Sequence, residues 1–305
     1  MEAEAVLAQD LTKVYGKEKM IAVNRVSFSV KSGELFGLIG PDGAGKTSIF
    51  RMLTTLLLPD GGTGTVAGFD IVKDYKKIRN AVGYMPGKFS LYPDLTVEEN
   101  LNFFATVFGT TIKENYHLIK DIYVQIERFR DRRAGKLSGG MKQKLALCCA
   151  LIHKPTVLFL DEPTTGVDPV SRKEFWEMLK RLKQEGITIV VSTPYMDEAT
   201  LCDRIALIQS GKILSINSPG EIVNSYGETL YAVKANNMFS LLKNLGSFDS
   251  TIDSYAYGEY AHARFRERTD VSELKKYLTN TGLEDVDIHE VQPTIEDCFI
   301  KLLKN

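Results

Sequence analysis

One glycine-rich string constrains the fold of this chain more than any other feature. It reads Gly40-Pro41-Asp42-Gly43-Ala44-Gly45-Lys46-Thr47. The apolar run at residues 35–39 precedes it, as a strand buried on both faces would show, and we expect residues 47–58 to form a helix. The glycines let the backbone curl around an anion, and the helix N-terminus adds positive potential. The spacing therefore predicts a phosphate cradle; a tight glycine turn alone would not require the strand, the helix and Lys46 together.

The cradle predicts a nucleoside triphosphate with Mg²⁺. In such cradles the lysine reaches the β- and γ-phosphates and the hydroxyl ligates the metal, so we assign these roles to Lys46 and Thr47 and include Ser48 in the binding set. A second apolar run, at 156–160, ends in Asp161 and Glu162. Asp161 is expected to hold Mg²⁺ through water, and Glu162 to polarise the attacking water. Without the cradle, a solvated acidic pair at a strand end would be the better interpretation.

Strands alternate with helices over the first two thirds of the chain. We expect strands at 20–30, 187–192 and 205–209, mostly helices over 97–150, and a helix from Asp168 and Pro169 to about Glu185. This order implies an α/β domain with a largely parallel sheet. The formal net charge of −1 gives no electrostatic footprint for nucleic acid.

The cysteines and the apolar runs limit the chemistry and the setting further. Cys148 and Cys149 lie in an apolar run, and none of the four cysteines has metal-ligand or C-x-x-C spacing, so we expect buried thiols in a reducing compartment. We expect no signal peptide and no spanning segment, since no apolar run approaches the ~20 residues that a bilayer requires.

The composition changes after residue 220, and a second domain is expected beyond it. A helix at 219–225 should bridge to strand 229–235, helix 237–245, strands 250–256 and 259–266, helix 270–281, strand 285–291 and helix 294–303. The β-α-β-β-α-β order is that of a ferredoxin-like domain. We find no catalytic constellation in it, and His262 and His289 stand alone as satisfied surface or core histidines. Whether it dimerises, braces the first domain or regulates it stays open.

A third string carries a family resemblance. It reads Leu137-Ser138-Gly139-Gly140-Met141-Lys142-Gln143 and resembles the signature of ATP-binding cassette (ABC) proteins. The chain as a whole resembles the ATP-binding subunit of an ABC transporter. The resemblance implies a P-loop NTPase fold of ABC type, with ATP and Mg²⁺ as cofactors. It places the cassette at 1–225, with a parallel-sheet core and a helical subdomain at about 88–150, and an α+β accessory domain at 226–305.

The resemblance also assigns roles to single residues. In that family Ser138, Gly139 and Gly140 meet the γ-phosphate held by the opposite subunit, although a plain helix N-cap at Ser138 is the simpler alternative. Tyr15 resembles the aromatic residue that stacks on adenine, and could equally be core. Asp168 lies in a string similar to the D-loop, which crosses the dimer interface.

The end of the chain narrows the resemblance to one group. It reads Val291-Gln-Pro-Thr-Ile-Glu-Asp-Cys-Phe299 and looks like the end of the accessory domain of ABC-2-type exporter ATPases. That group includes drug, polysaccharide and lipid exporters.

Two positions depart from the family pattern. The family usually has a glutamine where this chain has Gly87, and a histidine where it has Pro194. Those two side chains contact Mg²⁺, the attacking water and the γ-phosphate, whereas neither glycine nor proline can do so. Loss of one preorganised catalytic group typically lowers a rate by ~10²–10³. We therefore expect nucleotide binding with low intrinsic turnover of the chain alone.

The resemblance implies an ATPase subunit, with Glu162 as its catalytic residue, that powers an ABC-2-type exporter at the cytoplasmic face of the cell membrane. Its expected partners are an integral-membrane permease subunit, gripped by residues 89–101, and a second ATPase subunit. No nucleic-acid partner is expected. Two alternatives stay open: an ATP-sensing regulatory cassette, favoured by Gly87 and Pro194, and a soluble ABC ATPase outside transport.

Overall fold

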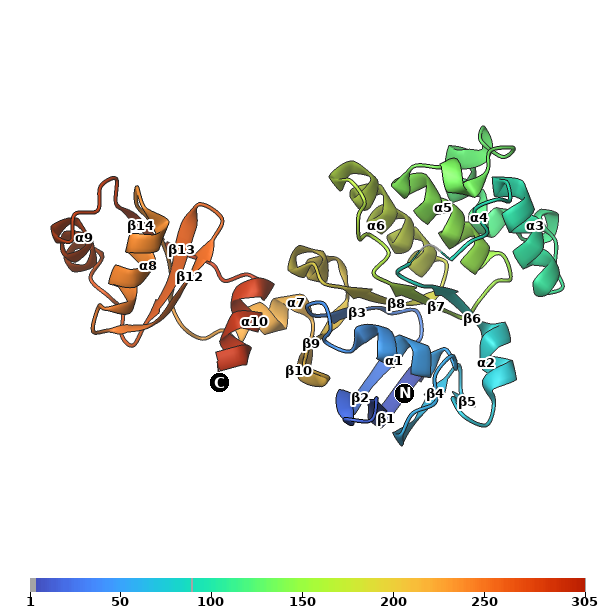
Figure 1. Ribbon diagram of the computed structural model, residues 1–305, viewed down its shortest axis with the longest axis horizontal. Coiled ribbons are helices and arrows are strands. Elements are labelled where there is room, and N and C mark those ends of the chain that lie inside the picture. Colours follow the sequence, from blue (N-terminus) through green and yellow to red (C-terminus); the bar gives the residue numbers. More distant parts are fainter. Residues whose placement is uncertain (1–3, 89, 305) are drawn as a thin grey trace. The chain divides into compact units, whose positions relative to one another are not determined.

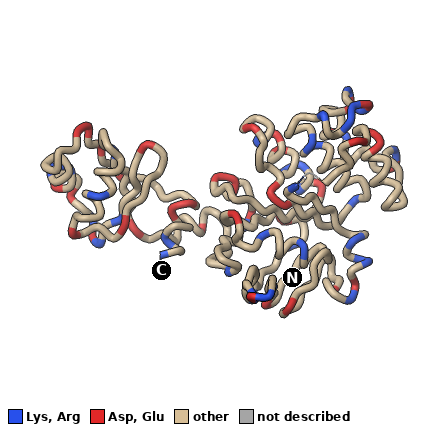
Figure 2. The backbone as a smooth tube through the Cα atoms, viewed as in Figure 1, with Lys and Arg blue, Asp and Glu red and all other residues tan. Residues whose placement is uncertain are grey.

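The computed structural model describes residues 4–88 and 90–304. By its contacts the chain divides into two compact units, Met1–Gly220 and Glu221–Asn305. The division falls at Gly220 rather than at residue 225, and lies within the short helix α7 (Pro219–Asn224). Figure 2 shows both signs of charge interspersed along each unit. Over the described residues, no helix is long and apolar enough to cross a membrane.

A six-stranded sheet forms the centre of the first unit. Its order is β10-β9-β3-β8-β7-β6, and all neighbours are parallel except β10, which pairs antiparallel with β9. Every residue of β3, β7 and β8 is buried, as expected for parallel strands covered on both faces. The parallel core predicted from the sequence is thereby confirmed. The strands are β3 (Leu35–Ile39), β6 (Val82–Met85), β7 (Val157–Asp161), β8 (Thr188–Thr193), β9 (Arg204–Gln209) and β10 (Lys212–Asn217).

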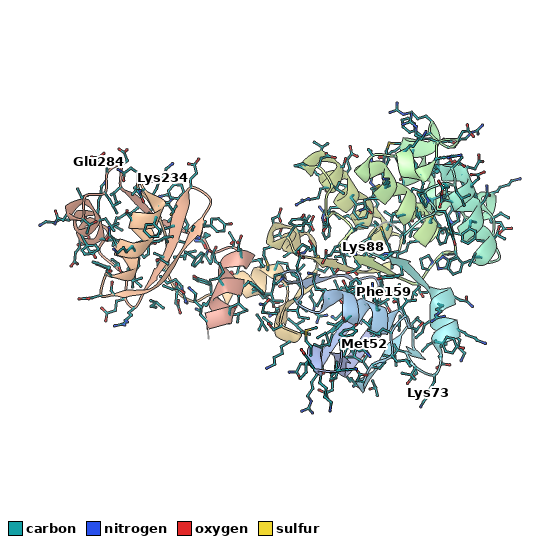
Figure 3. All side chains as sticks on the ribbon, viewed as in Figure 1. Met52, Lys73, Lys88, Phe159, Lys234 and Glu284 are labelled. Atoms are coloured by element: carbon teal, nitrogen blue, oxygen red, sulfur yellow. The ribbon has the colours of Figure 1, made fainter. Side chains whose placement is uncertain are left out.

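An antiparallel sheet forms a second layer of the first unit, in the order β2-β1-β4-β5. Helix α1 (Lys46–Leu53) lies between the two sheets (Figure 1). Met52 of α1 and Phe159 of β7, labelled in Figure 3, are fully buried in the core that the two sheets share, where Phe50 and Phe159 meet edge to face at 5.5 Å. The sequence predicted only β2 of these four strands. They are β1 (Glu4–Tyr15), β2 (Met20–Lys31), β4 (Gly61–Val66) and β5 (Phe69–Asp70).

The remaining helices of the first unit include a group that packs together beside the six-stranded sheet. Helices α3 and α4 both pack on α5, and α5 packs on α6, which covers β8 (Figure 1). Thr96 and Thr111 begin α3 and α4 with complete capping boxes, each closed by a glutamate three residues on. The helices are α2 (Tyr75–Ala81), α3 (Val97–Val107), α4 (Ile112–Glu127), α5 (Gly139–Leu151) and α6 (Pro169–Gln184).

The helix expected at 47–58 is shorter than predicted. Helix α1 ends at Leu53, and Thr55 has a left-handed backbone with φ of +63°. The amides of Leu56 and Leu57 then both bond to the carbonyl oxygen of Arg51, so the chain turns instead of continuing the helix. The sequence predicted a longer helix because residues 56–58 are apolar and continue the helical pattern beyond Leu53.

The second unit has the element order expected for a ferredoxin-like domain. Its antiparallel sheet runs β12-β13-β11-β14, and α8 and α9 cover one face through Leu241, Leu245, Leu274 and Leu278. The elements are β11 (Leu230–Lys234), α8 (Met238–Gly246), β12 (Thr251–Tyr257), β13 (Tyr260–Phe265), α9 (Val271–Asn280), β14 (Asp287–Val291) and α10 (Ile295–Lys304).

His262 is a satisfied core histidine and His289 a surface histidine, as the sequence predicted, although neither stands alone. His262 is buried, its Nδ1 lies 2.7 Å from Oδ1 of Asp297, and its ring stacks on Tyr257 at 4.2 Å. His289 is exposed, with its Nδ1 3.4 Å from Oδ2 of Asp287. The partner of His262 was missed because Asp297 is 35 residues away in the sequence and reaches His262 only through the packing of α10.

Candidate functional site

The glycine-rich string forms the turn between β3 and α1 that the sequence predicted. Gly45 caps α1 with φ of +103°, and a Cβ at this position would lie 2.4 Å from the carbonyl oxygen of Ala22. A Cβ on Gly40 would lie 2.1 Å from the carbonyl oxygen of Ile208. Both distances are far below van der Waals contact. The path of the loop therefore requires glycine at 40 and 45.

Lys46 holds its ammonium inside this loop. Its Nζ donates to the carbonyl oxygens of Gly40 at 2.7 Å and Pro41 at 3.0 Å, and lies 3.2 Å from Oε1 of Glu162. The lysine is only 3% exposed, so these carbonyl oxygens and the Glu162 carboxylate take the place of most of the water around its ammonium. A buried ammonium with a carboxylate partner suits a polyanionic ligand that can replace that partner.

The hydroxyl of Ser48, at the start of α1, lies beside that of Tyr15. Thr47 and Ser48 are half-buried, and the hydroxyls of Tyr15 and Ser48 are 3.1 Å apart. Tyr15 is also half-buried, at the end of β1. The aromatic ring is thus at the edge of the cradle rather than in the core, as a residue that stacks on a base would be.

The acidic pair is held by the last residues of β8, which the sequence did not single out. Ser192 pairs in register with Asp161 on one side and Leu38 on the other. Its hydroxyl donates to Oδ1 of Asp161 at 2.6 Å, and its carbonyl and hydroxyl oxygens both accept from the amide of Glu162. The carboxyl ends of three parallel strands therefore bring the cradle and both acids together.

Glu162 has an unusual backbone. Its φ is +50°, in the left-handed region that non-glycine residues seldom occupy. The two bonds from its amide to Ser192 hold it there. The turn aims the carboxylate at Lys46 instead of continuing the line of β7. Such strain is frequent where a side chain must be placed for chemistry.

Both departures from the family pattern adjoin the acidic pair or the cradle. A Cβ on Gly87 would lie 3.0 Å from the carbonyl oxygen of Asp161 and 3.6 Å from Cβ of Glu162. Pro194 follows Thr193, whose carbonyl oxygen accepts from the amide of Gly40 at 3.2 Å. The side chain of Lys88, labelled in Figure 3, is exposed. Gly87 and Pro194, which replace the glutamine and the histidine of the family pattern, therefore lie next to the acidic pair and next to a residue bonded to the cradle.

The signature and the D-loop lie together, at the adjacent starts of α5 and α6. Ser138 caps α5 by accepting from the amide of Met141 at 3.4 Å, and Asp168 caps α6 by accepting from Ser171 at 3.0 Å. A Cβ on Gly140 would lie 2.9 Å from the hydroxyl oxygen of Ser171, so the two starts touch. The backbone amide of Ser171 lowers the pKa of Asp168.

Ser138, Gly139, Gly140 and Asp168 are exposed or half-exposed. In the described part of the chain, the hydrogen bonds and ion pairs of Lys46, Asp161 and Glu162 do not extend to these four residues. Two groups of site residues result, one around the cradle and one open to solvent.

A pocket of about 380 Å³ opens beside the segment that follows β6. Mainly apolar side chains from β6, α3 and α5 line it, together with the terminus of α1. The lining includes Pro86, Leu91, Phe104, Val107, Phe108 and Cys149. Phe89, the first residue of the segment expected to grip a membrane subunit, lies outside the described residues, while Tyr92 is exposed.

Known proteins of the ABC transporter family are similar to this chain over most of its length. A family model described as ABC transporter matches residues 23–165. The probable multidrug ABC transporter ATP-binding protein YbhF of Escherichia coli (strain K12) is 38% identical over 287 residues, covering 92% of this chain and 49% of YbhF. The chain thus spans about half the length of that relative.

Two further relatives match over more of their own length. Nod factor export ATP-binding protein I of Rhizobium sp. (strain N33) is 34% identical over 306 residues, 99% of this chain and 98% of the relative. Linearmycin resistance ATP-binding protein LnrL of Bacillus subtilis (strain 168) is 39% identical over 224 residues, 72% of this chain and 71% of LnrL. The match to the Nod factor protein extends through the second unit.

Solved structures share the fold of the first unit. The cassette MJ0796, in a dimeric post-hydrolysis state bound to ADP and phosphate, is 26% identical with a TM-score of 0.64, covering 70% of this chain and 98% of that one. The subunit cbiO1 from Clostridium perfringens is 25% identical with a TM-score of 0.65, covering 73% and 92%. The glycine cradle, the paired acids, the signature and these relatives agree, and the chain belongs to the ATP-binding proteins of the ABC transporter family.

Proposed function

We propose that the chain binds ATP with Mg²⁺ and hydrolyses it, as the energy-coupling subunit of an ABC-2-type exporter. One observation carries the proposal: the buried ammonium of Lys46 lies 3.2 Å from the carboxylate of Glu162, at a loop that requires glycine at positions 40 and 45. The names of two relatives, a multidrug ABC transporter protein and a Nod factor export protein, support the transport role, and the match to the Nod factor export protein extends over the second unit.

Each residue of the cradle and of the acidic pair would have a separate role in binding or hydrolysing the nucleotide. Lys46 would exchange Glu162 and the loop carbonyls for phosphate oxygens, and so draw the triphosphate into the loop. Thr47 and Asp161 would hold Mg²⁺, with Asp161 oriented by the hydroxyl of Ser192. The metal would neutralise charge that develops on the phosphates. Glu162, once released from Lys46, would accept a proton from the attacking water.

Gly87 and Pro194 make slow turnover in this site part of the proposal. The two side chains that would finish a γ-phosphate sensor are replaced next to Asp161 and Gly40, while the residues that bind the ground state remain. The solvent-exposed Ser138 and its two glycines would then serve an ATP molecule held by a second ATPase subunit. The same observation favours one other candidate, a cassette that senses ATP without hydrolysing it.

A membrane subunit is the second proposed partner. The apolar pocket lined by Pro86 and Leu91 has a volume of about 380 Å³, exposed Val107 also lines it, and exposed Tyr92 follows Leu91 in the chain. An apolar pocket with exposed apolar side chains at it suits an interface with a partner protein. We propose that the chain is held at the cytoplasmic face of the membrane by this contact.

ATP binding and hydrolysis of the purified chain test the proposal. The wild type should bind ATP and hydrolyse it slowly, Lys46→Ala should abolish binding, and Glu162→Gln should bind ATP but abolish turnover. Restoring the sensor with Pro194→His and Gly87→Gln should raise the rate by about 10- to 100-fold, less than the full effect of two catalytic groups because Gln at 87 must displace the Asp161 carbonyl.

Each outcome separates one part of the proposal from the rest. ATP binding that survives Lys46→Ala would contradict the assignment of the cradle. Fast turnover of the wild type would contradict the slow site but not the ATPase role. ATP binding without turnover, even in the presence of the second ATPase subunit, would favour the sensing cassette.

A further inference from the structure

Arg172 connects helix α6 to the loop that follows β8. Its guanidinium lies 4.0 Å from the ring centroid of Tyr195, and its Nε lies 3.6 Å from Oε1 of Glu198. Its amide bonds to the carbonyl oxygen of Asp168 at 2.9 Å, one turn after the cap of α6. A single side chain thus links the D-loop end of α6 to residues 195–198.

The contacts continue from Glu198 to the cradle. Glu198 is 2% exposed, and its Oε2 accepts from the hydroxyl of Thr193 at 2.5 Å. That hydroxyl also accepts from the amide of Tyr195 at 3.1 Å. The carbonyl oxygen of Thr193 accepts from the amide of Gly40 at 3.2 Å. A series of neighbouring residues therefore leads from the D-loop end of α6 to the first residue of the glycine loop, with hydrogen bonds from Glu198 onward.

One contact in this series is not fully made. Nε of Arg172 and Oε1 of Glu198 are both buried, and neither has a hydrogen-bond partner among the described residues. Their separation of 3.6 Å exceeds the ~2.7–3.2 Å of a hydrogen bond. Buried polar atoms are seldom left unpaired, because the lost solvation is not replaced. A shift of less than about 1 Å would turn this contact into a charge-assisted hydrogen bond.

We propose that Arg172 is a positioning residue that couples the D-loop to the glycine loop, and that ATP-dependent movement of α6 closes the contact between Arg172 and Glu198. The inference rests on the proposed ATPase function. Proline at 194 has neither a side-chain donor nor an amide hydrogen, so the loop after β8 cannot report on a phosphate at that position. Arg172 sets the position of this loop from α6 instead, through Tyr195 and Glu198.

Three substitutions in α6 test the coupling. Arg172→Met removes the charge and keeps most of the volume, and Arg172→Lys keeps the charge without the planar fork. Arg181→Met is the matched control: Arg181 is on the same helix, its side chain is 59% exposed, and it lies 3.8 Å from Asp121. ATP hydrolysis gives kcat and KM, and titration with a fluorescent ATP analogue gives Kd.

We expect Arg172→Met to lower kcat by about 10- to 100-fold, the range for a displaced catalytic geometry, with KM and Kd changed by less than about twofold. Arg172→Lys should recover part of the loss, and Arg181→Met should match the wild type. Because Arg172 acts through the D-loop, its effect should not add to that of Asp168→Ala in a double-mutant cycle.

An Arg172→Met chain with the kcat of Arg181→Met would refute the coupling, and so would additive effects of Arg172→Met and Asp168→Ala. A wild-type chain that binds no ATP would refute the proposed function instead. The coupling then has its own readout, amide hydrogen exchange at Gly40 and Tyr195 without nucleotide. Arg172→Met should speed exchange at both amides and Arg181→Met at neither; equal exchange in the two variants would overturn the inference.

Discussion

Asp297 is the residue whose replacement should most disturb the second unit. Asp297 is fully buried. Its carboxylate accepts hydrogen bonds from Nδ1 of His262 at 2.7 Å, from the Tyr255 hydroxyl at 2.6 Å, and from both the amide and the hydroxyl of Thr294 at 2.7 Å. In Asp297→Asn one acceptor oxygen becomes an amide group that can only donate. At least one buried donor then faces another donor. An unsatisfied buried group costs about 1–3 kcal/mol, and the remaining bonds lose their charge assistance, so we expect a loss of about 2–4 kcal/mol.

The pKa of this carboxyl reflects the same hydrogen bonds. Burial alone would raise the pKa of Asp297, but the bonds from His262, Tyr255 and Thr294 outweigh burial and lower it from 3.8 to about 2. A depressed pKa means that the stabilisation is present above the unfolded value and is lost as the pH falls toward 2. The shift corresponds to about 2 kcal/mol, at the lower end of the range expected for the substitution. Acidification from pH 4 to 2 should therefore weaken the wild-type unit and have less effect on Asp297→Asn.

Hydrogen exchange in peptides of β12 and β13 measures this loss locally, which matters because a chain of two units need not unfold in one step. A loss of 2–4 kcal/mol corresponds to exchange faster by about 30- to 1000-fold. Asp287→Asn is the matched control, since that side chain is 58% exposed and an exposed ion pair contributes about 1 kcal/mol at most. Equal exchange in the two variants would refute the view that the buried carboxylate organises this unit.

Three further outcomes follow from local geometry. Gly40→Ala should lower the stability of the first unit by several kcal/mol in thermal unfolding, because its Cβ would lie 2.1 Å from the Ile208 carbonyl oxygen; an unchanged melting temperature would contradict this. Cys148 and Cys149 should react with Ellman's reagent only in denaturant, since both are buried and burial raises the pKa of both thiols; rapid labelling of the native chain would show the opposite. Thr111→Ala should cost about 1 kcal/mol in urea unfolding through loss of the capping box, and a neutral result would mean that α4 begins elsewhere.

The sequence predicted the elements whose signals are local. The buried strands β3 and β7 are short continuous apolar runs, and the start of α6 carries both Asp168 and a proline at the first turn. The antiparallel sheet was mostly missed. Strand β1 pairs with β2 through several register shifts, which break the alternation of apolar and polar residues on which a strand prediction depends.

The parts of the site that depend on long-range packing could not be predicted. Ser192 became a site residue only through its register with Asp161, 31 positions away, and its role needs the order of strands in the sheet. The contact of Arg172 with Glu198 needs the placement of α6 over β8. Neither contact has a sequence pattern of its own, whereas the glycine cradle is contiguous and has one.

The left-handed backbone of Glu162 means that fold stability and the proposed catalysis favour different residues at position 162. Glycine would adopt this conformation without strain, and asparagine with little, whereas glutamate gives up about 1 kcal/mol or more to hold it. Changes that stabilise the turn therefore remove the acid, and changes that keep the acid retain the strain. A chain released from any need for turnover would gain stability by losing this residue. The retention of Glu162 beside Gly87 therefore supports the proposed slow hydrolysis over the alternative of a cassette that only senses ATP.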